Sequence, residues 1–200
     1  MISEAEKIRF STAFSACSHA GMTHKTALTE HRKHSHFPYR MDYNGRMKTV
    51  IQRVSEASVT IDGKVHGVIE KGYMILVGFC DSDDENTVRV MGDKIARLRI
   101  FEDENGKMNL NLSQVNGAIL SISQFTLYAD TAKGNRPSFT GAGKPEHASK
   151  LYDYFNSYMR SLGFRVEEGI FGADMKVRLL NDGPVTILLD SKDMKKANHV

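Results

Sequence analysis

The run Tyr73–Phe79 (YMILVGF) contains no charged or amide side chain and lies between a Lys-Gly pair and an acidic segment. It is far too short to cross a membrane, which takes about 20 apolar residues. A strand with one solvent-exposed face alternates apolar and polar residues. A short, uninterrupted run of apolar residues is instead typical of a strand buried on both faces. The chain must therefore form a sheet with cover on both sides of this strand.

Two amphipathic segments can provide helical cover. After DSDDEN, apolar residues recur at spacings of three, four and three, at Val88, Met91, Ile95 and Leu98. A second helix is predicted to begin at Pro145, a good first helical residue, and to end before Gly163, a good residue just past a helix end. Its expected buried face consists of Leu151, Tyr154, Phe155, Tyr158 and Leu162.

Most of the remaining regular segments have the composition of strands. The turn signal Asp62-Gly63 predicts a hairpin between Ser58–Ile61 and Val65–Ile69. Further strands are predicted at Val50–Val54, Ala118–Leu127, Arg165–Gly169, Lys176–Leu180 and Val185–Asp190. We therefore expect one mixed, strand-rich α/β domain over residues 47–194, with two layered sheets covered by two helices.

The first 46 residues differ from this domain. They carry seven Lys/Arg against four Asp/Glu and five of the eight histidines, so the remainder has 27 − 7 = 20 basic and 24 − 4 = 20 acidic residues. They show no regular period, and we predict a poorly ordered basic, His-rich extension. A targeting segment, an upstream start misread as coding and a metal-binding His tract are the alternatives. Residues 195–200 are predicted to be a C-terminal tail.

Composition excludes several classes of protein. No stretch approaches 18 uninterrupted apolar residues, which predicts no membrane span, and the N-terminus lacks the apolar core of a secretory signal. The two cysteines, Cys17 and Cys80, are too few for a disulfide scaffold or a four-cysteine zinc site. A reduced, cytoplasmic location is the natural expectation. No metal site and no cofactor are predicted.

The sequence carries none of the common catalytic or phosphate-binding motifs, such as G-x-S-x-G, H-E-x-x-H, a P-loop or G-x-G-x-x-G. It does carry two unusual polar stretches beside apolar strands. Ser123–Leu127 (SQFTL) ends a buried strand, where an unpaired amide costs about 1–3 kcal/mol. Asn181–Thr186 (NDGPVT) separates two predicted strands. Both stretches are also compatible with ordinary turns.

Together with three further segments, these stretches resemble the D-aminoacyl-tRNA deacylase family. The further segments are MKTVIQRVSEASVTIDG, KGNRPSF and FGADMKV, all in the family's order. The resemblance covers about residues 47–192, and residues 1–46 have no counterpart in it.

The resemblance implies a homodimer that hydrolyses the ester between a D-amino acid and the 3′-terminal adenosine of tRNA, and also removes glycine from alanine tRNA. Its pocket and oxyanion backbone would be formed at the dimer interface by Ser123, Gln124, Phe125 and Thr126. A cis Gly183-Pro184 pair of the partner would exclude L-amino acids. Met175, Thr186 and Arg53 are the other substrate-site residues implied, with Arg53 supporting the Gly-Pro pair. Neither DNA nor a membrane is expected as a partner.

The family mechanism uses the substrate's own ribose 2′-hydroxyl, which explains why no protein nucleophile or base is evident. Two alternatives stay open from the residues: an esterase with Thr126 or Thr186 as nucleophile, and a non-catalytic tRNA-binding dimer. An intact SQFTL stretch with a Gly-Pro pair favours the catalytic reading.

A domain with no net charge can bind tRNA only through a local basic patch. Lys133, Arg136 and Lys144, separated by glycines, form such a patch next to the SQFTL segment. We expect it to contact acceptor-stem phosphates, with a simple solvated loop as the alternative.

Overall fold

The computed structural model describes residues 46–194; apart from Arg46, the predicted extension 1–46 and tail 195–200 lie outside the described residues. The described strands are β1 (Lys48–Ile61), β2 (Lys64–Ile69), β3 (Gly72–Gly78), β4 (Phe101–Glu102), β5 (Met108–Leu110), β6 (Ala118–Ser123), β7 (Val166–Glu168) and β8 (Met175–Asp190). The helices are α1 (Glu85–Arg97) and α2 (Pro145–Ser161), with short 3-10 turns at Ser113–Val115, Phe125–Tyr128 and Ser191–Asp193.

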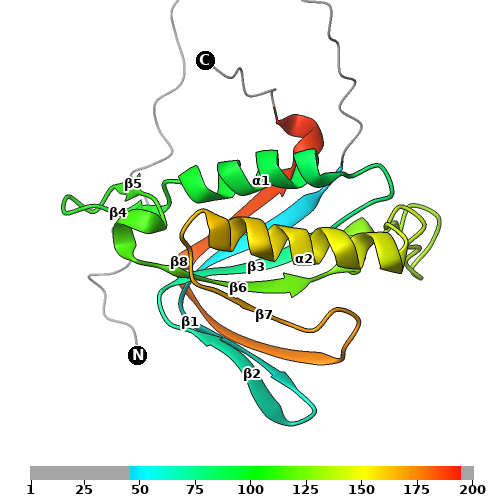
Figure 1. Cartoon of the computed structure of the whole chain (residues 1–200), viewed down its shortest axis with the longest axis horizontal. Coiled ribbons are helices and arrows are strands. Elements are labelled where there is room, and N and C mark those ends of the chain that lie inside the picture. The colour runs from blue at the N-terminus through cyan, green and yellow to red at the C-terminus, as the bar shows by residue number, and fades with distance from the viewer. Residues whose placement is uncertain (1–45, 195–200) are drawn as a thin grey trace, which may run out of the picture. The chain divides into compact units, whose positions relative to one another are not determined.

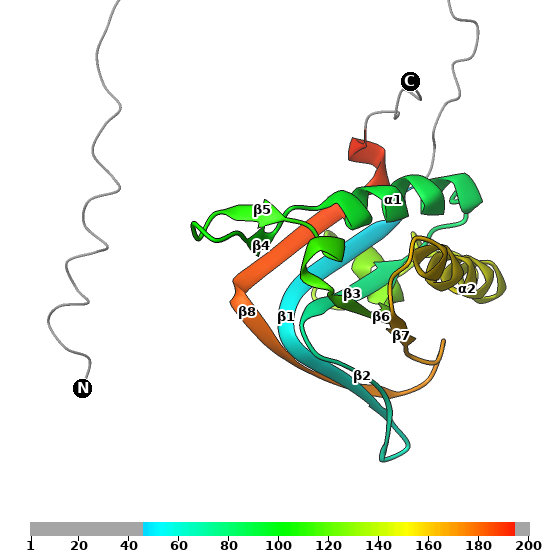
Figure 2. The same cartoon turned by 60° about the vertical axis from the view of Figure 1, so that its left-hand side comes forward.

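Six strands form one strongly curved sheet (Figure 2). Its order is β2-β1-β3-β6-β7, and β8 pairs with β1 along nearly its whole length. On the opposite edge of β1, the first half pairs with β3 and the second half with β2. Strands β4 and β5 form a separate two-stranded sheet. The predicted mixed, strand-rich α/β class with two helices is confirmed.

The two-sided burial predicted for Tyr73–Phe79 arises from this curvature. Tyr73, Ile75 and Val77 of β3 enter a core shared with α1 and α2, which lie over this face of the sheet (Figure 1). Met74 points into a second core together with residues of the distal half of β1, such as Val59, and of β2. The second layer is therefore the far half of the same curved sheet.

Helix α1 has the predicted inner face and a well-defined start. Val88, Met91 and Ile95 are fully buried, and Leu98, just past the helix end, packs against the same core. The Asp84 side chain accepts a hydrogen bond from the Thr87 N–H, while the Thr87 hydroxyl lies within reach of the Asp84 N–H, as in a capping box. Such caps contribute about 1 kcal/mol.

The predicted inner face of α2 was partly wrong. Leu151 and Phe155 are buried, but Leu162 is 39% exposed, and Tyr154 and Tyr158 are only half-buried. Both phenols lie at the rim, where Tyr158 donates to Asp93 and Tyr154 accepts from Arg89 of α1. A phenol hydroxyl needs a polar partner, which keeps these rings at the helix–helix margin. The buried face is completed by Ala148, Tyr152, Asn156 and Met159.

Three strand boundaries also differ from the predictions. Val50–Val54 and Ser58–Ile61 are parts of the single strand β1, and Lys176–Leu180 and Val185–Asp190 are parts of the single strand β8. Each continues because the two strands pair with each other on both sides of an irregularity. The predicted strand Ala118–Leu127 ends at Ser123, since the chain turns there into a 3-10 helix.

Candidate functional site

A pocket of about 280 Å³ lies where β6 ends and β8 begins. One wall is formed by Ile122–Phe125 and the other by Phe171–Met175, with Val177 of β8 completing it. The fold thus brings Ser123, Gln124 and Phe125 together with Met175, which lies about fifty residues further along the chain. Strand β7 closes this distance, because it pairs with β6 and the chain reaches Met175 only a few residues after β7 ends.

The Ser123–Thr126 segment turns sharply at the pocket. The Gln124 N–H donates to the Val77 carbonyl at 2.7 Å, continuing the β3–β6 pairing by one residue. A 3-10 turn begins at Phe125, and the first N–H groups of such a turn have no partner within it. The Gln124 N–H is thus occupied within the sheet, and the Phe125 N–H is better placed to donate to a group in the pocket.

The polar side chains here interact with each other. The Gln124 amide donates to the Thr126 hydroxyl, so the flanking hydroxyl provides the partner that the glutamine was expected to need. Both residues are at least partly exposed, and the Phe125 ring is 58% exposed. This ring packs edge-on against Phe139, with 5.1 Å between ring centroids.

Gly183 and Pro184 project from a bulge in the β1–β8 ladder. Gln52 pairs with Thr186 and Val54 with Asn181, so the four residues 182–185 of β8 stand opposite the single residue Arg53. Such an excess bends a strand and directs its residues out of the ladder. The Gly183-Pro184 peptide is cis, as predicted.

The buried side chain of Arg53 holds this bulge against the body of the domain. Its side chain is 4% exposed; Nε donates to the Asp182 carbonyl at 3.1 Å and lies 3.2 Å from the Asp182 carboxylate. Nη1 donates to the Ile100 carbonyl at 2.7 Å, and Nη2 lies 3.6 Å from Glu102. The planar guanidinium thus ties the bulge to the segment that follows α1.

Asn181 also stabilises this bulge through its side chain. Its side-chain oxygen accepts the Val185 N–H at 3.1 Å, and its amide nitrogen donates to Gln52. The amide nitrogen also lies 3.4 Å from the Thr186 hydroxyl, which is exposed. Gly183 is packed so tightly that an added Cβ would stand 2.7 Å from Val185 and 2.9 Å from Arg53.

The structure separates the predicted site residues into two groups. Ser123, Gln124, Phe125 and Met175 line the pocket, and Thr126 follows them directly. Arg53, Gly183, Pro184 and Thr186 gather at the bulge, and none of them lines the pocket of its own chain. Phe171 also lines the pocket but was not among the predicted site residues, although it is the first residue of the FGADMKV segment.

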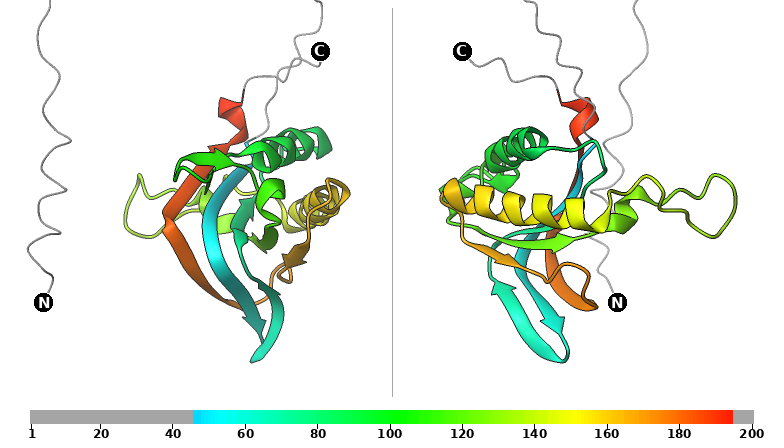
Figure 3. Two further views of the ribbon diagram at one scale, coloured as in Figure 1. Left: turned by 90° about the vertical axis from the view of Figure 1, so that its left-hand side faces the viewer. Right: turned by 45° about the vertical axis from the view of Figure 1, so that its right-hand side comes forward.

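The three basic residues proposed for RNA contact are exposed. Lys133 and Arg136 belong to a loop that extends away from the end of β6 (Figure 3, right). A single antiparallel bridge, Asp130 with Ser138, closes its base. Lys144 directly precedes α2, at its N-cap position, and its backbone N–H donates to the Asp81 side chain.

Residues 46–194, which the structure describes, contain no helix long and apolar enough to cross a membrane. They also contain no group of three or more His, Cys, Asp or Glu side chains that could hold a metal ion.

Comparisons with known proteins match this domain. Residues 50–190 fit the family model described as D-Tyr-tRNA(Tyr) deacylase. A D-aminoacyl-tRNA deacylase of Koribacter versatilis is 56% identical over 146 residues, which are 73% of this chain and 98% of that protein. One of Halothermothrix orenii is 55% identical over 145 residues, 72% of this chain and 97% of its own length.

A solved structure also matches this domain. The structure named "c-Myc DNA Unwinding Element Binding Protein" is 40% identical, with a TM-score of 0.67, and the match covers 71% of this chain and 97% of that one. The resemblance inferred from SQFTL and NDGPVT is thereby confirmed.

Proposed function

The chain belongs to the D-aminoacyl-tRNA deacylase family, and from this premise we propose that it hydrolyses the ester between a D-amino acid and the 3′-terminal adenosine of tRNA. Glycine carried by alanine tRNA is proposed as a second substrate. The observation that carries the proposal is the pocket formed by Ser123–Phe125 and Met175, because it joins two of the segments on which the family resemblance rests. A cytoplasmic location belongs to the same proposal.

In the proposed mechanism the protein positions the ester and stabilises the developing oxyanion. The Phe125 N–H, at the start of a 3-10 turn, is the donor best placed for this role. The terminal ribose 2′-hydroxyl of the tRNA orients or activates the attacking water. Such a site needs no side-chain nucleophile, since both reacting groups come from the substrate and solvent.

We propose that the Gly183-Pro184 bulge acts on the pocket of a second copy of the chain. Asp182, Gly183 and Pro184 of the bulge are exposed, Arg53 holds the bulge, and none of its residues lines the pocket of its own chain. A rigid wall placed where an L side chain would project excludes every L-amino acid by the same steric clash. Glycine has no side chain and would pass such a wall.

The tRNA itself would bind along the exposed segments beside the pocket. Lys133, Arg136 and Lys144 can contact backbone phosphates, and the exposed ring of Phe125 can stack with a base. Since a relative's name refers to DNA, duplex DNA is a useful competitor: we expect it to inhibit less than uncharged tRNA at equal nucleotide concentration.

The test compares D-Tyr-tRNA with L-Tyr-tRNA at equal enzyme concentration, measuring release of the amino acid. We expect the D substrate to be hydrolysed at least about a hundredfold faster. Equal rates would contradict the proposed exclusion of L-amino acids by Gly183-Pro184. If neither substrate is hydrolysed, the non-catalytic tRNA-binding dimer is favoured. Sedimentation of the same sample checks the dimer.

The alternative with a threonine nucleophile makes a separate prediction. The hydrogen bonds recorded for the hydroxyls of Thr126 and Thr186 are with the amides of Gln124 and Asn181, which cannot act as bases. We expect Thr126→Ala and Thr186→Ala each to retain kcat within about tenfold of the wild type. A fall of a thousandfold in a folded variant, or a covalent acyl-enzyme detected by mass spectrometry, would support the nucleophile instead.

A further inference from the structure

A buried polar cluster lies behind the pocket wall, on the side facing α2. Tyr152 and Asn156, one helical turn apart, are 2% and 1% exposed, and Ser121 of β6 is fully buried beside them. Among the described residues, the Asn156 amide and the Ser121 hydroxyl have no hydrogen-bond partner of ordinary geometry. Buried groups of this kind are uncommon in native proteins and call for an explanation.

Tyr152 contacts both walls of the pocket from behind. Its hydroxyl donates to the Ser121 carbonyl at 2.7 Å, and Ser121 directly precedes the wall segment Ile122–Phe125. Its ring lies against Phe171 of the opposite wall, with 6.3 Å between the centroids. One side chain therefore joins two segments that are far apart in the sequence.

The two walls also meet through the Ser121 carbonyl. This oxygen accepts the Gly169 N–H at 3.0 Å as well as the Tyr152 hydroxyl. Gly169 begins the segment that leads to Phe171 and Met175. A Cβ at Gly169 would stand 2.3 Å from the Met175 sulfur and 3.3 Å from Ile122, so the walls are in close contact there.

Burial keeps the Tyr152 hydroxyl protonated, as the donor to Ser121 that this geometry needs. Burial is the main influence on the phenol and raises its pKa; interactions with Ser121 and Asn156 partly oppose that rise. Asn156 thus lies close enough to influence the hydroxyl.

We propose that Tyr152 is a positioning residue for the deacylation reaction, assisted by Asn156. This inference rests on the proposed function. Tyr152 holds the Ser121 carbonyl and thereby sets the place of the Phe125 N–H relative to the Phe171–Met175 wall. It does not touch the substrate. Its loss should therefore reduce the chemical step and leave tRNA capture, which uses the exposed surface, unchanged.

The test is Tyr152→Phe, which removes only the hydroxyl and keeps the ring against Phe171. We expect kcat for D-Tyr-tRNA to fall about tenfold or more, because small displacements of reacting groups are costly, while KM stays within about twofold. Circular dichroism at the assay temperature verifies that the variant is fully folded.

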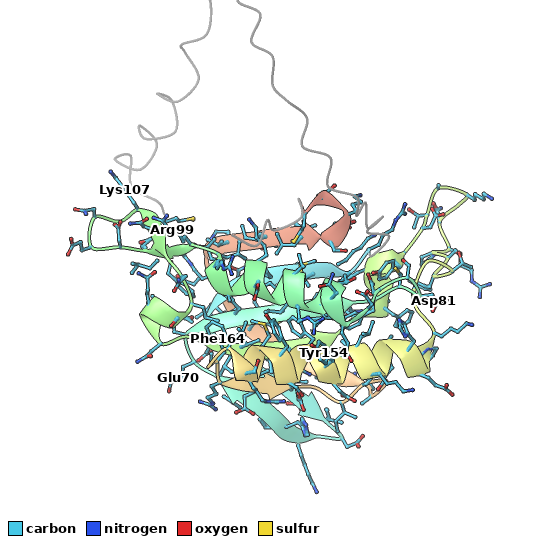
Figure 4. All side chains as sticks on the ribbon, turned by 45° about the horizontal axis from the view of Figure 1, so that its top comes forward. Glu70, Asp81, Arg99, Lys107, Tyr154 and Phe164 are labelled. Atoms are coloured by element: carbon cyan, nitrogen blue, oxygen red, sulfur yellow. The ribbon has the colours of Figure 1, made fainter. Side chains whose placement is uncertain are left out.

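The matched control is Tyr154→Phe, two residues along the same helix. Its hydroxyl bonds Arg89 at the rim of α2 (Figure 4), so both kinetic constants should match the wild type. A Tyr152→Phe enzyme with wild-type kcat, or one changed only in KM, overturns the inference.

A second variant decides the matter if Tyr152→Phe does not fold. Asn156→Ala keeps the Tyr152–Ser121 bond and removes the amide beside it, and we expect kcat to fall about threefold or more at constant KM. An unchanged kcat overturns the inference. A wild-type enzyme that does not hydrolyse D-Tyr-tRNA would instead contradict the proposed function itself, which separates the two failures.

Discussion

Adding one methyl group at Gly72 is expected to destabilise the domain strongly. A Cβ there would stand 1.9 Å from the Ala118 carbonyl oxygen and 2.8 Å from two further backbone atoms of Ala118. No side chain can move to relieve this clash, so β3 and β6 would have to separate where their parallel pairing begins. We expect Gly72→Ala to cost more than about 4 kcal/mol and to lower Tm by roughly 10 °C or more.

Gly106→Ala is the matched control. Gly106 has a φ of +71°, and nothing lies within 4 Å of its added Cβ. Only the backbone cost of a left-handed conformation remains, about 1 kcal/mol. Thermal unfolding followed by circular dichroism measures both variants, and a Gly72→Ala protein as stable as Gly106→Ala would contradict the strand pairing described above.

Replacing Arg53 with methionine is expected to lower both stability and selectivity. The change leaves the Ile100 and Asp182 carbonyls without their donor and removes the partner of two carboxylates. Asp182 and Glu102 are 48% and 58% exposed and can be solvated, so the main loss is that of the buried hydrogen bonds, about 3 kcal/mol. The expected fall in Tm is roughly 6–12 °C.

The selectivity effect depends on the proposed role of the bulge. Without the guanidinium, Asp182 loses its hydrogen bond and ion pair with the body of the domain, and we expect the preference for D- over L-Tyr-tRNA to fall about tenfold or more. The assay is the same pair of substrates, at a temperature where the variant is folded. Retention of the full preference would contradict the role of Arg53 in holding the wall.

Arg99→Met controls for the loss of a guanidinium. Arg99 is exposed near the β4–β5 sheet (Figure 4), and its Nε donates to the Asn109 carbonyl at 2.7 Å. An exposed hydrogen bond of this kind contributes little, so stability should change by less than about 0.5 kcal/mol and selectivity should not change.

The helices show how much local pattern can predict. The spacing of Val88, Met91 and Ile95 places them on one side of any α-helix, and the structure buries all three. The same rule failed in part for α2, because apolar spacing does not distinguish a ring that is fully covered from a ring at the edge of a contact. Tyr152 was missed, and Tyr154 was wrongly placed inside, since only the tertiary structure decides that Tyr152 bonds Ser121 of β6 and that Tyr154 bonds Arg89 of α1.

The boundaries of the strands depended on partners far away in the sequence. Periodicity suggested breaks inside β1 and β8, yet each strand continues because it pairs with the other across the irregularity. The end of β6 was likewise set by the 3-10 turn at Phe125, a change of backbone direction that the apolar run Ala118–Leu127 does not encode.

By itself, the sequence determined the fold class, the inner face of α1, the burial of Tyr73–Phe79 and the two polar stretches that mark the family. Each of these follows from residues close together in the chain, whose spacing or order fixes the outcome. Tertiary structure alone decided that β1 and β8 are continuous and that four residues of β8 stand opposite Arg53. It also placed Tyr152 behind both walls of the pocket. Arg53 and Asp182 are 129 positions apart, and such pairing becomes favourable only when the whole sheet has formed and its shared core offsets the entropy of closing so long a loop.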